Sequence, residues 1–161
     1  MAEDYFIDRG SFFYSSKYRP LINCFTKLSG LDEVSKTPLY QNVPQVLVMA
    51  AAIGLSKNLT EAVDTKDRSD VFIGGVNNTK IHGESVAHWV ALIVWLKQDD
   101  LASPILKVEN DTELCNIFNE LAMGGLSYLE RMQFKSGLTD PSGRELLTDE
   151  LIKAIKKVKK K

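Results

Sequence analysis

Cysteine and histidine, which often cross-link small proteins or bind metals, are scarce in this sequence. Its 161 residues include two cysteines, Cys24 and Cys115, and two histidines, His82 and His88. The cysteines lie far apart, and neither has the Cys-x-x-Cys or Cys/His spacing of a metal site. We therefore expect two reduced, buried thiols and a protein with no metal and no other cofactor.

Long apolar runs are also missing. The longest, residues 86–96, contains His88 and is too short to cross a bilayer. The acidic start of the chain lacks the basic region and the apolar stretch of a secretory signal. These features predict a cytoplasmic protein with no membrane span.

Glycine and proline number only 10 and 5, and 44% of the residues are apolar. This composition excludes disordered, collagen-like and low-complexity chains. A chain of this length buries roughly two-thirds of the surface that it exposes when unfolded. We predict one helical domain over residues 1–161, with a short aromatic arm at 1–15 and a lysine-rich helix end at 151–161.

The charge is nearly balanced in total but uneven along the chain. Residues 151–161 carry six lysines and no acid, so the net charge of −1 leaves −7 for the other 150 residues. An acidic body repels nucleic acid wherever lysine and arginine are not clustered. A broad nucleic-acid-binding face on the body is therefore disfavoured.

Hydrophobic spacing predicts a mainly α-helical bundle of about five helices with at most one small β-hairpin. The predicted helices cover residues 17–28, 44–53, 85–97, 111–133 and 142–158. Gly54 is the expected end of the second helix, and Asn110 with Glu113 resembles the start of the fourth. Because residues 86–96 are apolar on almost every side, we expect them to form the centre of the core.

The candidate strands are short and leave alternatives open. The aromatic residues around Asp8-Arg9-Gly10 fit either a hairpin or an extended arm packed on the body. Residues 71–73 are predicted to pair with 80–82 across a turn at Asn77-Asn78, with Gly74-Gly75 as turn residues.

No set of residues carries a clear catalytic signature. The chain has no phosphate-binding P-loop, no Gly-x-Ser-x-Gly motif and no His-Glu-x-x-His motif. His88 is expected to be a core histidine, and a pair of His82 with Glu84 lacks a nucleophile or metal set. Residues 64–66 match the acid-x-Lys motif of metal-dependent nucleases. They lie in a polar loop, however, where the carboxylate would not be held rigidly toward a metal ion.

The C-terminal lysines are a weak candidate for nucleic-acid contact. They are Lys153, Lys156, Lys157, Lys159, Lys160 and Lys161. A solvated tail is the favoured interpretation, since no aromatic platform for bases lies near them.

The adjacent glycines Gly124 and Gly125 fall inside the predicted helix 111–133. Gly125 lies on the apolar stripe with Leu121 and Leu129, whereas Gly124 falls beside it. We expect another backbone to approach Gly125 closely, so Gly125→Ala should cost more stability than Gly124→Ala.

Two segments together resemble a known family. Residues 38–54 resemble a family motif in which an aromatic residue and a short gap precede a Val/Ala-rich helix that ends in glycine, here Gly54. Residues 116–126 are similar to the family signature Ile-Phe-Glu-Glu-Tyr-Ala-Asn-Gly-Gly-Leu. Both occur, in this order, in the bacterial family called Dnd system-associated protein 4. The sequence departs from the signature at Leu121 and Met123. The motif residues singled out here are Gly54, Ala122, Gly124 and Gly125.

The resemblance implies a genomic setting, namely the genes that accompany this one, more than a reaction mechanism. Members of the family accompany genes for DNA phosphorothioation, which places sulfur in the DNA backbone for host defence, and no catalytic residues carry over. The leading hypothesis is a non-enzymatic accessory or adaptor protein of a phosphorothioation or related restriction-modification system. Its partners would be other proteins of a DNA-modification complex. The alternatives are a DNA-binding regulator that uses the C-terminal lysines, and an enzyme whose acids and His82 assemble only in three dimensions.

Overall fold

The protein is mainly α-helical, as predicted. The computed structural model describes residues 7–26, 42–71, 73–98, 110–136 and 156, which form five α-helices, one 3-10 turn and two antiparallel strand pairs. The elements are β1 (Phe12–Ser15), η1 (Ser16–Tyr18), α1 (Arg19–Thr26), α2 (Val43–Lys57), β2 (Arg68–Val71), α3 (Ile73–Asn78), β3 (Lys80–Ile81), β4 (Glu84–Ser85), α4 (Val86–Lys97) and α5 (Asp111–Ser136).

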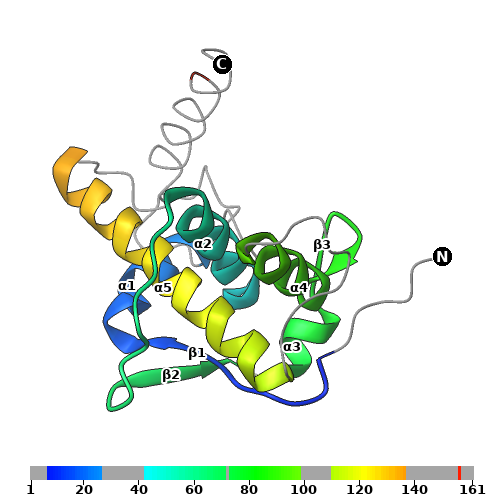
Figure 1. Ribbon diagram of the computed structural model, residues 1–161. Helices are drawn as coiled ribbons and strands as arrows, with labels where there is room; N and C mark the ends of the chain where they lie inside the picture. The colour runs from blue at the N-terminus through cyan, green and yellow to red at the C-terminus, as the bar shows by residue number, and fades with distance from the viewer. Residues whose placement is uncertain (1–6, 27–41, 72, 99–109, 137–155, 157–161) are drawn as a thin grey trace, which may run out of the picture.

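Helix α5 is the central element of the fold. In Figure 1 it crosses the whole domain, with α2 and α4 on one side and α1 and β1 on the other. Its side chains Leu114, Phe118, Leu121, Leu126 and Leu129 are all buried. The rings of Phe118 and of Phe12 in β1 pack in a T-shaped arrangement with centroids 5.7 Å apart. The core therefore forms around α5, with α2 as its main partner.

The expectation that residues 86–96 form the centre of the core is wrong. Helix α4 lies at the side of the α2–α5 pair and exposes Leu92 and Leu96, which are 37% and 40% accessible. Its inner face, including Val90 and Val94, is buried. The physical reason is that α2 and α5 carry the small residues that allow close approach, so these two helices meet at the centre.

Glycines make this close approach of α2 and α5 possible. A β-carbon on Gly125 would overlap the carbonyl group of Ala50, and one on Gly54 would overlap the carbonyl group of Leu121. Gly124 lies in the contact too, against the carbonyl group of Leu59, and not beside it as the spacing indicated. The chain that follows α2 folds back over α5 and brings Leu59 there.

The helix ends are set by local hydrogen bonds. Asn110 caps α5, as predicted, by accepting from Glu113 N at 2.9 Å. Asn42, for which no cap was predicted, caps α2 by accepting from Gln45 N at 3.3 Å. Gly54 does not end α2: it lies inside the helix, at the contact with α5. The helix continues to Lys57 and ends at Asn58, whose φ of 53° is left-handed.

The two strand pairs differ from the predicted pairing. β1 pairs with β2, with Phe12 opposite Val71 and Ser15 opposite Arg68. The described part of the aromatic arm forms no hairpin of its own: it bends at Arg9 and continues into β1. Residues 73–78 form α3 and not a turn. β3 and β4 form a tight hairpin whose turn holds His82 and Gly83, both with positive φ.

The first and the last predicted helices lie only partly within the described residues. The first helix begins at Arg19, after a 3-10 turn, and is described to Thr26. The predicted helix 142–158 lies outside the described residues except for Lys156, which is helical and exposed.

We predict that Gly125→Ala and Gly54→Ala each destabilise the protein by about 1–3 kcal/mol or more, because the added methyl meets backbone that cannot move aside. Gly124→Ala should also destabilise. The matched control is Gly75→Ala in α3, where a β-carbon would lie 3.8 Å from Pro44 Cγ, an ordinary contact. Chemical denaturation measures all four variants. Equal midpoints for Gly125→Ala and Gly75→Ala would contradict the close-contact interpretation.

Candidate functional site

An N-terminal segment without regular secondary structure, residues 7–11, is bound across α3 and α5; we call it the strap. Asn77 of α3 pairs with both backbone groups of Ile7, accepting from its N at 3.0 Å and donating to its O at 2.9 Å. Asp111 Oδ2 accepts from the backbone N of Asp8 at 2.9 Å and of Arg9 at 3.2 Å. Side chains thus recognise the backbone of the strap.

The strap covers Cys115. A β-carbon on Gly10, whose φ is +124°, would lie only 2.6 Å from Cys115 Sγ, so glycine is required at this crossing. Burial and the neighbouring Asp111 carboxylate raise the pKa of the Cys115 thiol to about 12. Because a thiol rather than a thiolate is present at neutral pH while the strap buries it, Cys115 in this covered state is not equipped to act as a nucleophile.

Asn119 completes the row of α5 side chains beneath the strap. Its Nδ2 donates to Ser11 O at 3.0 Å, and its side chain is 2% exposed. Its Oδ1 has no hydrogen-bond partner among the described residues. One turn further along α5, Met123 Sδ accepts from Ser15 N at 3.4 Å. These contacts anchor the strap and β1 to α5.

A charged cluster joins η1 to the chain between α2 and β2. The hydroxyl of Tyr18 donates to the Glu61 carboxylate at 2.8 Å, and Lys17 Nζ lies 2.7 Å from the same group. Burial opposes ionisation of Glu61, but the hydrogen bonds from Lys17 and Tyr18 outweigh it and lower the pKa of this carboxyl. The hydrogen bond to Glu61 in turn raises the pKa of Lys17. Because the Lys17 and Glu61 charges are paired with each other, we interpret this cluster as one that stabilises the fold.

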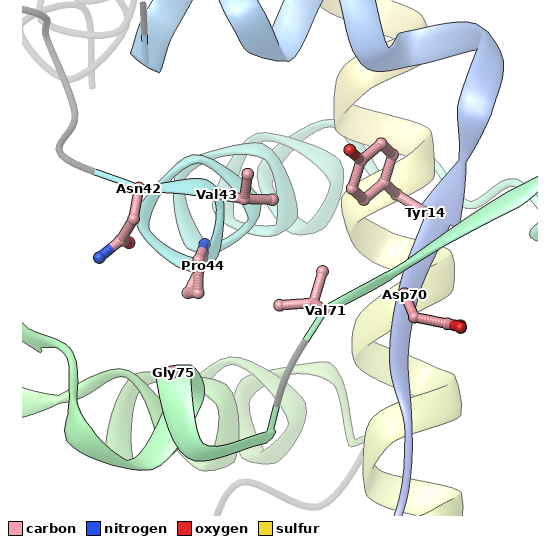
Figure 2. Close-up of a pocket in the computed structure, with 7 residues that line it drawn as sticks. All are labelled: Tyr14, Asn42, Val43, Pro44, Asp70, Val71 and Gly75. Carbon is pink, nitrogen blue, oxygen red and sulfur yellow. The ribbon is translucent and has the colours of Figure 1, made fainter.

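A pocket of about 280 Å³ lies where the β1–β2 pair meets the start of α2 and α3 (Figure 2). Figure 2 shows Tyr14, Val71, Pro44 and Val43 turned toward it. Asn42, at its rim, already donates to Thr79 Oγ1 at 3.2 Å. The lining is mostly apolar, so the pocket suits an apolar group better than a charged ligand.

The outer face of α4 is the most exposed apolar surface among the described residues. Leu92 and Leu96 lie one turn apart on this face, and both are exposed. Trp89 and Trp95 are half-buried in the same helix. Trp89 is held by a bond from its Nε1 to Ile81 O at 3.1 Å. The helix therefore presents a rigid apolar face.

The histidines are placed differently from the expectation. His88 is not a core residue, because its side chain is 40% exposed, and its Nδ1 lies 3.8 Å from Glu84 Oε2. Glu84 therefore faces His88, one helical turn away, while His82 lies exposed in the β3–β4 turn. The structure does not bring the two imidazoles together in a catalytic arrangement.

The other candidate residues fall into three groups. Asp64 Oδ1 accepts from Lys66 N at 2.9 Å, so this carboxylate organises a turn. Of the C-terminal lysines, only Lys156 is described, and the nucleic-acid contact stays a prediction. Ala122 is buried in α5 beside the glycines, so the motif residues line the α2–α5 contact.

Neither a metal centre nor a membrane span is found in the described part of the chain. No group of three His, Cys, Asp or Glu side chains there could hold a metal ion. None of the helices described is long and apolar enough to cross a bilayer.

We predict that Glu61→Gln removes part of the acid sensitivity of folding. Because the pKa of Glu61 is lowered by folding, its contribution to stability is complete above the ordinary value of 4.5 and is lost as the pH falls through the lower folded value. Urea denaturation between pH 3 and pH 7 measures this slope. The control is Glu120→Gln, an exposed carboxylate on α5. Parallel pH profiles for wild type and Glu61→Gln would contradict the prediction.

We predict that the strap controls access to Cys115. In a Cys24→Ser background, Asn77→Ala removes both bonds to Ile7 and should raise the rate of maleimide labelling of Cys115 by about tenfold. Asn78→Ala is the matched control, since Asn78 is the exposed neighbour on the same helix. Equal labelling rates for the two variants would show that the strap does not govern access.

Comparison with known proteins identifies one family. The family model for DNA sulphur modification system-associated protein 4 matches residues 13–158. No match is found among curated proteins or among solved structures. The matched range includes the α2–α5 contact and the outer face of α4.

Proposed function

Because the chain belongs to the DNA sulphur modification system-associated protein 4 family, we propose that it is a non-enzymatic adaptor that binds another protein of that system through α4. The family membership supplies the association with DNA sulphur modification. The adaptor role, the docking face and a part in defence against phage are our proposal.

The observation that carries the proposal is the outer face of α4. Apolar side chains scattered singly on a surface are ordinary, but here two exposed leucines share one face of a helix that is apolar on almost every side. Exposed large apolar patches on soluble proteins mark contacts with other macromolecules. The same row of α4 continues from the leucines to His88 and the Glu84 carboxylate, which lie 3.8 Å apart. Apolar side chains next to a carboxylate suit a protein surface better than the phosphates of DNA.

The helix is also rigid enough to act as a docking element. Ser85 caps it by accepting from His88 N at 3.2 Å, and its inner residues Val90 and Ile93 are buried against the core. A preformed apolar face loses little conformational entropy when a partner binds. Docking by such a face requires no chemical step and no bound cofactor.

The test is capture of the proteins encoded beside this one. We predict that Leu92→Gln/Leu96→Gln weakens co-purification of a partner at least about tenfold, because central apolar contacts carry most of the binding energy of such interfaces. The variant should fold normally, since both side chains are exposed. Asn116→Gln, on the exposed side of α5, is the control.

Two results would decide against the adaptor. Unchanged capture by the double variant would exclude the α4 face as the docking site. Binding of duplex DNA that is lost when the six C-terminal lysines are replaced would favour the DNA-binding regulator instead. Exposure of the helical Lys156 is the described feature on which that alternative rests.

A further inference from the structure

Strand β2 is the outer strand of its sheet. β1 packs against α5, and β2 pairs with β1 on the side away from that helix. Figure 1 shows β2 along the outer edge of the domain, below β1 in this view. One long side of β2 therefore faces away from the body.

The hydrogen-bond phase shows which residues of β2 face outward. Ser16 N donates to Asp67 O at 2.9 Å, in the same register that places Ser15 opposite Arg68. Because bonding alternates along an antiparallel pair, the backbone groups of Ser69 and Val71 turn toward β1 and those of Arg68 and Asp70 turn outward. β1 agrees with this phase, since Ser15 N points away from β2 and donates to Met123 Sδ.

The outward row of β2 is open among the described residues. No described residue bonds to the backbone N–H or C=O groups of Arg68 and Asp70. An edge strand with unpaired backbone groups is a template for another strand. Proteins often block such edges with charges of one sign, but this edge carries one cation and one anion.

The charges on this edge are self-complementary. Arg68 and Asp70 lie on the same face of β2, with their side chains 45% and 82% exposed. If a second β2 runs antiparallel with Ser69 opposite the partner's Ser69, Arg68 falls opposite the partner's Asp70, and Asp70 opposite the partner's Arg68. Opposite charges facing each other across strands stabilise a pair, and like charges destabilise it.

The backbone phase of the same register is also correct. The backbones of Arg68 and the partner's Asp70 would form a hydrogen-bonded pair, in which each residue donates its N–H to the C=O of the other. Asp70 and the partner's Arg68 would form the same pair by symmetry. Ser69 would form the non-bonded pair between them. The Arg68 guanidinium lies over the ring of Phe13, 4.3 Å from its centroid, and its Nε is 3.8 Å from Asp70 Oδ1 of the same strand. Pairing would therefore place the partner's Asp70 and Arg68 beside an exposed ion pair and join the two pairs into one four-charge cluster.

We infer that a second copy of this chain pairs with the outer edge of β2, so that the sheets of two protomers join across a two-fold axis at Ser69. The inference is independent of the α4 docking face. Its consequence for that face is that one assembly would present two copies of α4.

The experiment is a charge-swap series on the full chain, followed by sedimentation equilibrium. Wild type should approach twice the chain mass of 18.0 kDa as concentration rises. Arg68→Asp and Asp70→Arg each give positions 68 and 70 the same charge, so that like charges would face each other across the two strands. Each variant should therefore weaken self-association about tenfold or more. Arg68→Asp/Asp70→Arg restores opposite charges in the same register and should restore pairing. An equimolar mixture of the two single variants should form a heterodimer.

Controls separate this edge from other causes of association. Arg131→Asp and Glu120→Arg make the same charge changes on exposed positions of α5 and should leave association unchanged. Circular dichroism identifies any variant that fails to fold, and the mixture of single variants keeps the test valid if the double variant does so. A monomeric wild type, or a dimer unaffected by charge reversal but lost in Leu92→Gln/Leu96→Gln, would overturn the inference.

Discussion

The contact between α2 and α5 is the constraint on which the rest of the structure depends. Gly54 meets the carbonyl group of Leu121, and Gly125 meets that of Ala50, so the two backbones approach where side chains would normally separate them. This close approach sets the position of everything attached to α2 and α5. It also explains why the glycines persist inside helices, where each costs roughly 1 kcal/mol relative to alanine.

The family motif therefore describes packing more than chemistry. Its glycines and Ala122 are buried between helices, and none of them is available to a ligand. The surfaces that suit a partner lie elsewhere, on the outer face of α4 and along β2. Both are displayed by the α2–α5 core, because α4 packs on α2 and α5 while β2 is held by β1.

The N-terminal segment shows a second way in which the fold uses backbone recognition. Asn77 and Asp111 bind backbone groups of the strap, so the strap is held through its backbone more than by its side chains. Ile7 is the exception, because its side chain is fully buried. The strap then continues into β1, which carries β2 at the edge of the domain.

The sequence by itself determined the helical class, four of the helices to within a few residues where they are described, and the cap at Asn110, because periodicity and capping are local. It also indicated that Gly125 meets another backbone. The pairing of β1 with β2 joins segments more than fifty residues apart, and no local pattern could specify it. The exposure of Leu92, the pairing of Glu84 with His88 and the open edge at Arg68 were decided by tertiary structure. The physical reason is that burial depends on which surfaces meet: an apolar helix is central only if its neighbours approach it closely, and here the glycines let α2 and α5 approach each other most closely.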